Sequence, residues 1–206
     1  MKITGETKLF AGIIIATLLI IGIGVVIYSR PAPTYTREEL IPVGTVTKGN
    51  KDASTYLVEF SDFQCPSCKL FKDAVSELTD KYKDKLFYAF RHYPLQQHQE
   101  AQKAAAAVEA AGAQGKFWEM HNWLFDNQDK LTDKAIEEEA GKIGLDKKIF
   151  LEDLSSGKYN DKINKDITDG QKLGISATPT FFLNGQKLEL FSVDELKKAV
   201  EKAIGK

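Results

Sequence analysis

The chain has 206 residues, of which 43% are hydrophobic and 28% are charged, so it can bury one sizeable core but hardly two full domains. Its 28 Lys and Arg against 29 Asp and Glu give a net charge of -1, which offers no basic field for phosphates and argues against a nucleic-acid partner. The counts of 15 Gly, 6 Pro and 2 Cys argue against collagen-like, disordered and disulfide-stapled chains.

The amino-terminal region contains an uncharged apolar segment from Phe10 to Tyr28. A helix over this segment would be about 28 Å long, close to the hydrocarbon core of a bilayer, which is about 30 Å thick. No small-residue cleavage site follows, so residues 1–30 are predicted to be an uncleaved membrane anchor; a cleaved signal peptide and a buried soluble helix are the alternatives. Lys2 and Lys8 before the apolar segment favour a cytoplasmic amino terminus and an extracytoplasmic remainder.

Residues 31–45 contain three of the prolines, Pro31, Pro33 and Pro42. This composition predicts a stiff spacer rather than a packed element. The folded domain is expected to follow over residues 46–206.

Within the domain, the apolar pattern predicts alternating strands and helices. Short buried strands are expected at 56–60 and 86–93, with a helix at 66–83 whose apolar residues recur at helical spacing. No proline lies between Pro94 and Pro179, and an alanine-rich run begins a series of helical patterns. We therefore expect a block of four or five helices at about 97–174.

The last part of the chain predicts a hairpin and a closing helix. An Asn-Gly turn between two short apolar runs indicates a β-hairpin over 180–190. Ser192 and Glu195 predict a capping box at the start of the last helix, and Phe191 and Leu196 a hydrophobic staple across it. The order β-α-β, helical block, β-β-α indicates an α/β fold with an all-helical insertion, preceded by the transmembrane helix.

Cys65 and Cys68 are the only cysteines, and they lie between a predicted strand and a predicted helix. Residues three apart in a first helical turn have alpha carbons about 5 to 6 Å apart, within the range that a disulfide accepts. Unpaired amides at the helix start favour an anion and can bring a thiol pKa to about 3.5 to 7.5. Cys65 is therefore the predicted nucleophile and Cys68 the resolving thiol of a redox pair.

Two other interpretations of the cysteine pair stay open. A static disulfide would contribute little to stability, because the loop it closes is short. A zinc or copper site would need further ligands at positions without a recognisable ligand spacing. The histidines that could supply them are His92, His98 and His121.

At these residues the sequence resembles the DsbA-like branch of the thioredoxin superfamily, which contains exported thiol-disulfide oxidoreductases. Four stretches carry the resemblance, which extends over about residues 46–204: 58–68 (VEFSDFQCPSC), 91–95 (RHYPL), 115–121 (GKFWEMH) and 178–185 (TPTFFLNG). It implies a thioredoxin fold with a helical insertion. The Pro66-Ser67 dipeptide between the cysteines is most similar to that of membrane-tethered relatives in Gram-positive bacteria.

The resemblance also assigns roles to residues outside the cysteine motif. Glu59 is expected on the same face of a central strand as Leu57 and Ser61, where burial would raise its pKa. By resemblance it would exchange protons with Cys68, although a surface glutamate is the simpler alternative from sequence alone. The resemblance further implies a cis peptide bond before Pro179, with the backbone of Thr178 presented to an extended substrate peptide.

The sequence thus predicts a single-pass, extracytoplasmic thiol-disulfide oxidoreductase that donates its Cys65–Cys68 disulfide to reduced or unfolded exported proteins, without a cofactor or metal. The resemblance implies reoxidation by a quinone-linked membrane partner of the DsbB or VKOR kind. A reductase or isomerase with the same site is the first alternative. A metal-binding chaperone and an adhesion domain with an inert disulfide are the others.

Overall fold

The computed structural model describes residues 5–28 and 33–205, with the side chains of residue 10, residues 12–24 and residues 33–205. The chain divides into two compact units, Met1–Pro33 and Thr34–Lys206. Each unit is therefore considered by itself.

Described residues of the first unit form the helix α1 (Gly5–Tyr28). Its described apolar side chains are exposed; Phe10 is 65% exposed and Ile20 is 70% exposed. The anchor expected over Phe10–Tyr28 includes residue 11 and residues 25–28, whose side chains lie outside the description. Over the residues that are described, no helix combines the length and the hydropathy needed to cross a bilayer.

The second unit is built on a mixed sheet in the order β1-β3-β2-β4-β5. Its strands are β1 (Val46–Gly49), β2 (Thr55–Ser61), β3 (Leu86–His92), β4 (Thr180–Leu183) and β5 (Gln186–Lys187). The central strands β2 and β3 run parallel, and every other pairing is antiparallel. Both central strands are almost entirely buried, which explains their nearly continuous apolar sequences.

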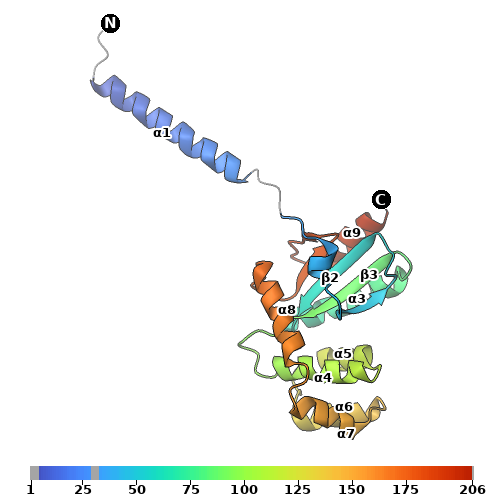
Figure 1. The fold of residues 1–206 in the computed structure, drawn as a ribbon. Coiled ribbons are helices and arrows are strands. Elements are labelled where there is room, and N and C mark those ends of the chain that lie inside the picture. The colour runs from blue at the N-terminus through green and yellow to red at the C-terminus, as the bar shows by residue number, and fades with distance from the viewer. Residues whose placement is uncertain (1–4, 29–32, 206) are drawn as a thin grey trace. The chain divides into compact units, whose positions relative to one another are not determined.

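Helices cover both faces of the sheet. They are α2 (Arg37–Leu40), α3 (Pro66–Lys81), α4 (Ala101–Ala113), α5 (Phe117–Asp126), α6 (Asp133–Lys142), α7 (Lys147–Ser155), α8 (Asn160–Lys172) and α9 (Val193–Ile204). Helices α4 to α8 lie between β3 and β4 in the chain, so the expected helical insertion is confirmed. Figure 1 shows α6 and α7 at the end of this unit that is farthest from the sheet.

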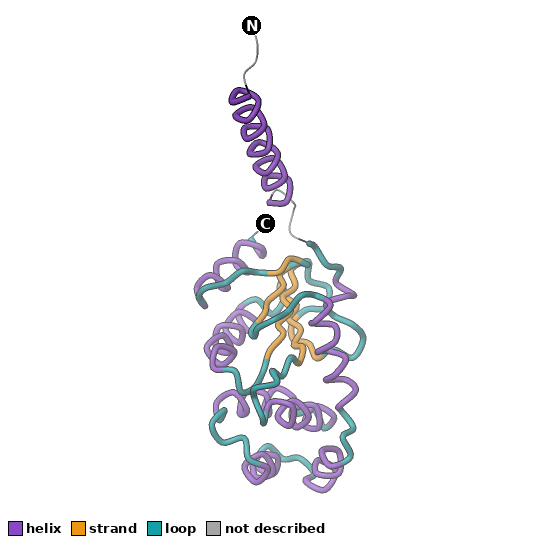
Figure 2. Tube along the Cα trace, turned by 90° about the vertical axis from the view of Figure 1, so that its left-hand side faces the viewer, coloured by secondary structure: helices purple, strands orange, loops and turns teal. Residues whose placement is uncertain are grey.

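Two apolar clusters lie on opposite faces of the sheet, because neighbouring residues of a strand point to opposite sides. Leu57 and Phe181 pack on one face with α3, α9 and the insertion helices. Val58 and Phe182 pack on the other face with Leu40 of α2 and the residues that follow α8. The strands accordingly lie between layers of helices (Figure 2). Glu59 shares the face of Leu57, as its position in the strand predicted.

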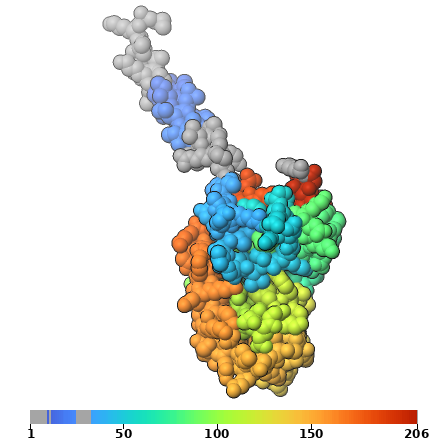
Figure 3. All heavy atoms as spheres, turned by 45° about the vertical axis from the view of Figure 1, so that its right-hand side comes forward, coloured from blue at the N-terminus to red at the C-terminus, as the bar shows by residue number. Residues whose placement is uncertain are grey.

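The segment before β1 differs from the spacer expected at 31–45, of which residues 31 and 32 lie outside the description. Thr34 forms a β-bridge to β5, and the backbone N–H of Tyr35 donates to the Gly185 carbonyl at 2.9 Å. Leu40 of α2 is fully buried. Figure 3 shows this segment, in blue, spread over the surface of the domain. This segment packs against the domain although it contains prolines, because apolar side chains recur along it. The compact unit therefore begins at Thr34.

The expected hairpin and closing helix are present with two differences. The second hairpin strand ends at Lys187 rather than Leu190. Ser192 caps α9 by accepting from the Glu195 N–H, but the Glu195 carboxylate accepts from the N–H of Phe191 rather than from that of Ser192. The predicted staple is wrong, because Phe191 is 93% exposed.

Candidate active site

The two cysteines lie where β2 passes into α3. Cys65 is the N-cap residue of α3 and Pro66 occupies the first helical position, where its missing N–H costs no hydrogen bond. Cys65 is 7% exposed and Cys68 is fully buried, and both are free thiols. The sulfur nearer the surface therefore belongs to the helix terminus, as the spacing predicted.

A second loop, more than a hundred residues later in the chain, meets this helix start. The Thr178-Pro179 peptide bond is cis, which confirms that expectation. The thiol of Cys65 lies 3.3 Å from the carbonyl oxygen of Thr178 and donates to it. The structure therefore brings Thr178 and Pro179 together with the cysteine pair, at the end of the sheet where β2 and β4 adjoin.

The environment of Cys65 favours its thiolate. A hydrogen bond from the Cys68 thiol is the largest influence, and it lowers the pKa of Cys65 to about 5 against the opposing effect of burial. The side chain of Thr178 and the backbone amides of Ser67 and Cys68 lower this pKa further. Burial instead raises the pKa of Cys68, and so does the neighbouring Cys65. One thiol of the pair is thus ionised at neutral pH while the other keeps its proton.

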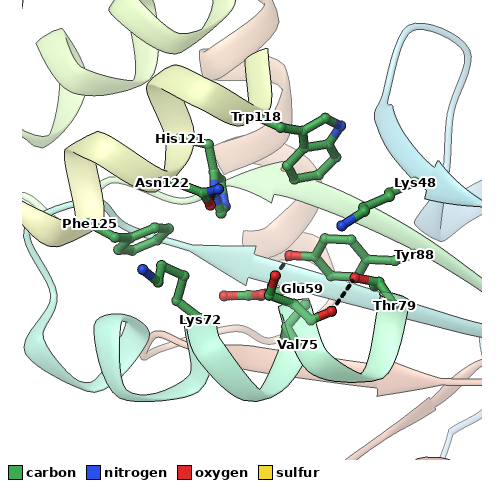
Figure 4. Close-up of a pocket in the computed structure, with 11 residues that line it drawn as sticks. Lys48, Glu59, Lys72, Val75, Thr79, Tyr88, Trp118, His121, Asn122 and Phe125 are labelled. Atoms are coloured by element: carbon green, nitrogen blue, oxygen red, sulfur yellow. Dashed lines mark hydrogen bonds between the residues drawn. The ribbon is translucent and has the colours of Figure 1, made fainter. Parts of the chain in front are cut away.

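Glu59 lies in the middle of β2 and is 2% exposed. The hydroxyl of Tyr88, on the adjacent strand β3, donates to its carboxylate oxygen Oε2 at 2.6 Å (Figure 4). Burial raises the pKa of Glu59 to about 7, although the Tyr88 hydrogen bond lowers it. A negative charge on Glu59 in turn helps to raise the pKa of Cys68.

A small cavity of about 40 Å³ adjoins Glu59 on the α3 and α5 side. Figure 4 shows His121 and Trp118 of α5 on one side of Glu59, with Lys72 of α3 on another. Burial lowers the pKa of His121 to about 4, so its ring lines the cavity in the neutral form. A polar cavity of this size can hold buried water. The cavity therefore leaves room for a water molecule beside Glu59.

A larger groove of about 470 Å³ begins at the cis-proline loop and runs along the start of α3. Its lining includes Ser67, Thr178 and Pro179, together with Leu70 and Phe191. Leu70 is 69% exposed and Phe191 is 93% exposed. Exposed large apolar side chains that line one groove are typical of a surface that contacts another molecule.

Sequence reasoning missed several residues that contact this site. The side-chain amide of Gln128, between α5 and α6, donates to the carbonyl oxygen of Cys65 at 2.9 Å. Tyr88 and Asp62 also went unnoticed. Tyr88 lies opposite Leu57 in the parallel strand pair, two residues before Phe90, the partner of Glu59, so Tyr88 and Glu59 share one face of the sheet. Gln128 lies in a loop with no pattern that could have indicated it.

The metal-site alternative requires a cluster of ligand side chains around the cysteine pair. Among residues 5–28 and 33–205, no three His, Cys, Asp or Glu side chains are placed to hold one metal ion. The side chain of His92 lies 2.8 Å from Glu109, and His98 lies 2.7 Å from Asp62. These two histidines are therefore occupied with carboxylates of the fold.

Comparison with known proteins agrees with this geometry. The profile of a protein family described as Thioredoxin matches residues 42–202. The crystal structure of BdbD from Bacillus subtilis is 25% identical and superposes with a TM-score of 0.74, over 86% of this chain and 100% of that one. A variant of alpha-DsbA1 from Wolbachia pipientis is 27% identical with a TM-score of 0.69, over 82% and 94%.

A curated relative is a much longer protein. The Na(+)/H(+) antiporter NhaA 1 of Mycolicibacterium vanbaalenii is 40% identical over 141 residues, which are 67% of this chain. Those residues are only 23% of the antiporter, so this chain spans about a quarter of its relative's length.

Proposed function

This chain belongs to the thioredoxin family, among its DsbA-like thiol-disulfide oxidoreductases, and from that premise we propose that it is a disulfide oxidase acting outside the cytoplasm. Cys65, Cys68, Pro66 and Ser67 form its reactive motif, and Thr178 with Pro179 binds the substrate. The observation that carries the proposal is the lowered pKa of Cys65, about 5, in a thiol that contacts Thr178, which lines a groove together with the cis-proline.

The proposed reaction starts from the Cys65–Cys68 disulfide. A substrate thiolate attacks the Cys65 sulfur, the Cys65–Cys68 bond breaks, and Cys68 leaves as a thiolate that takes the proton of Glu59. A second substrate thiolate then attacks the substrate sulfur of the mixed disulfide and releases Cys65 as a thiolate. Two electrons pass from the substrate dithiol to the protein, the substrate gains a disulfide, and Glu59 recovers its proton through the adjoining cavity.

The direction of the proposed exchange depends on whether the site stabilises the reduced or the oxidised cysteine pair. Hydrogen bonds to the Cys65 thiolate exist only when the pair is reduced, so they favour the reduced protein and make its disulfide a stronger oxidant. Thr178 supports binding, because its backbone would pair with an extended peptide whose sulfur reaches Cys65. The exposed apolar side chains of the groove favour reduced or unfolded exported proteins as substrates.

The remaining features of the proposal concern its place in the cell. We propose that residues 1–30 anchor the chain in the cell membrane with the domain on the extracytoplasmic side. Such an anchor would hold the site near a quinone-linked membrane protein of the DsbB or VKOR kind that reoxidises it. Joining of a similar domain to the antiporter NhaA 1 is consistent with work at a membrane.

The test measures redox potential and activity together. Equilibration with glutathione should give a potential clearly less negative than the about -270 mV of thioredoxin. The oxidised protein should introduce disulfides into a reduced, unfolded ribonuclease, and Cys65→Ala should abolish this activity. A potential near that of thioredoxin would overturn the oxidase direction and favour a reductase. Retention of activity in Cys65→Ala would overturn the site itself.

A further inference from the structure

A buried carboxylate that disulfide exchange does not use lies just before the cysteine motif. Asp62 is 1% exposed, and it follows the last residue of β2. Its Oδ1 accepts from the backbone N–H of Gln64 at 2.7 Å. Its Oδ2 accepts from the N–H of Leu95 at 2.8 Å and pairs with Nδ1 of His98 at 2.7 Å. Three hydrogen bonds converge on this one side chain.

These bonds join two segments that are far apart in sequence. The first is the loop 62–65, in which the N–H of Cys65 also donates to the backbone carbonyl of Asp62 at 3.1 Å. The second is the segment 94–100 after β3, whose Glu100 N–H donates to the Gln64 side chain at 2.5 Å. Asp62 therefore ties the loop that presents Cys65 to the segment leading into the helical insertion.

Burial of the Asp62 carboxylate costs free energy, so we expect this side chain to make a compensating contribution. A buried carboxylate is tolerated when hydrogen bonds compensate for its lost hydration, and removal of its partners leaves a large penalty. A negative charge close to Cys65 would by itself disfavour the thiolate. The hydrogen bonds that fix the loop 62–65 would favour it, so the two roles predict opposite changes in the pKa of Cys65 when Asp62 is replaced.

We propose that Asp62 is a positioning residue for the exchange reaction, with His98 as its partner at the surface. By fixing the loop 62–65 against the segment 94–100, Asp62 holds Cys65 where Cys68, Thr178 and the first amides of α3 stabilise its thiolate. This inference rests on the proposed function for its purpose. The geometric effect on Cys65 exists whether or not the protein is an oxidase.

The experiment separates two effects of Asp62 on the pKa of Cys65. A nearby negative charge would raise this pKa, whereas the hydrogen bonds that position Cys65 would lower it. The rate of alkylation of the reduced full chain by iodoacetamide is measured against pH, which reports the pKa of Cys65 without any substrate protein. Asp62→Ala removes the charge and all three bonds, and the pKa of Cys65 should rise by about one unit, a tenfold change in the ionisation equilibrium. Asp62→Asn keeps an acceptor for Gln64, and the rise should be smaller.

The outcomes decide between positioning and charge. If Asp62 acted only as a charge, both variants would lower the pKa of Cys65, and this result would overturn the proposal. An unchanged pKa in Asp62→Ala would overturn it as well. An inactive wild type with a lowered Cys65 pKa would count against the proposed function and leave the positioning role intact.

Two further sets of variants complete the test. A variant of another buried carboxylate shows whether lower stability alone changes the pKa of Cys65, and variants of His98 test the proposal if Asp62→Ala does not fold. Asp166 is also a buried carboxylate, and it accepts from the backbone N–H of His92 and from Arg91. Asp166→Asn should lower stability without changing the Cys65 titration. His98→Ala should raise the pKa of Cys65, and His98→Gln, which can still donate to Asp62, should restore it. Equal effects of the two His98 variants would contradict positioning through this bond.

Discussion

Cys65 and Glu59 have pKa values shifted in opposite directions for different physical reasons. Donors around the sulfur lower the pKa of Cys65 to about 5, whereas burial raises that of Glu59 to about 7. Between these two values Cys65 is a thiolate while Glu59 still holds its proton. The reduced site can therefore hold a thiolate and a protonated carboxyl at one pH, and in the proposed reaction that carboxyl supplies the proton that Cys68 takes when the disulfide opens.

The buried acid makes stability depend on pH in a defined direction. The pKa of Glu59 is raised from 4.5 to about 7 in the folded protein. The contribution of Glu59 to the free energy of unfolding is therefore fully present below pH 4.5 and is lost as the pH rises through 7. Glu59→Gln keeps a neutral side chain, so above pH 7 its free energy of unfolding should exceed that of the wild type, by up to about 3 kcal/mol. Urea denaturation of the reduced proteins on both sides of this range measures the difference.

A second buried glutamate supplies a control of opposite sign. Burial raises the pKa of Glu109, but His92 and Lys162 more than offset this, and the net pKa is lowered. Glu109→Gln should therefore lose stability at neutral pH, where Glu59→Gln gains it. Parallel pH profiles for wild type and Glu59→Gln would contradict the assignment. The exchange rate of Glu59→Gln should also fall, because Cys68 loses its proton donor.

Among the elements, those with a strong period could be predicted from the sequence. The helix over 66–81 follows from apolar residues at helical spacing and a proline at its start, and β2 from a continuous apolar run. The edge strand β1 and the four-residue helix α2 were missed, since such short segments carry no period. Phe191 was misassigned because local pairing rules do not tell whether an apolar residue packs inward or lines a groove.

One side chain links three elements of the domain. Arg91 of β3 is fully buried; its Nε donates to Asp166 at 2.6 Å and its Nη2 to Asp169 at 2.7 Å, both in α8. Its Nη1 also donates to the carbonyl oxygen of Leu40 in α2 at 3.0 Å. The layer of helices on this face of the sheet is thus held partly by charge.

Arg91→Ala should destabilise the domain strongly, because it leaves two carboxylates without their buried partner. Breaking a buried ion pair on one side costs about 3 to 5 kcal/mol. Lys165 pairs with the same Asp169 at 2.7 Å, but its side chain is 61% exposed. Lys165→Ala should therefore change stability little. Urea denaturation of both variants tests this prediction, and equal effects would show that the buried network contributes no more than a surface pair.

At the scale of the whole molecule, the reactive site combines parts that the sequence separates widely. The cysteine motif and the Thr178-Pro179 loop could be predicted together only through the family resemblance, because nothing local indicates that they meet. Asp62 and Gln128 could not be predicted as contacts of this site, since Asp62 accepts from the backbone of the distant Leu95 and Gln128 donates to the backbone of the distant Cys65. Backbone contacts leave no signature in the side-chain pattern.

The boundary between the two units has a consequence that truncation can measure. Residues 34–41 pack on the sheet, with Leu40 fully buried and Tyr35 bonded to the turn at Gly185. A chain of residues 34–206 should therefore unfold at the same urea concentration as the domain of the full chain. A chain that starts at Val46, the boundary predicted from sequence, should unfold at a lower concentration.

Point variants in the full chain show whether packing rather than length causes this loss. Leu40→Ala removes a fully buried side chain, so the free energy of unfolding should fall by about 2 to 5 kcal/mol. Val43 lies three residues later and its side chain is completely exposed, so Val43→Ala should have no measurable effect. Equal stability of Leu40→Ala and Val43→Ala would mean that the segment is a spacer after all. A specific loss in Leu40→Ala would place the start of the folded domain before α2, and the connection to the amino-terminal helix would then be only a few residues long.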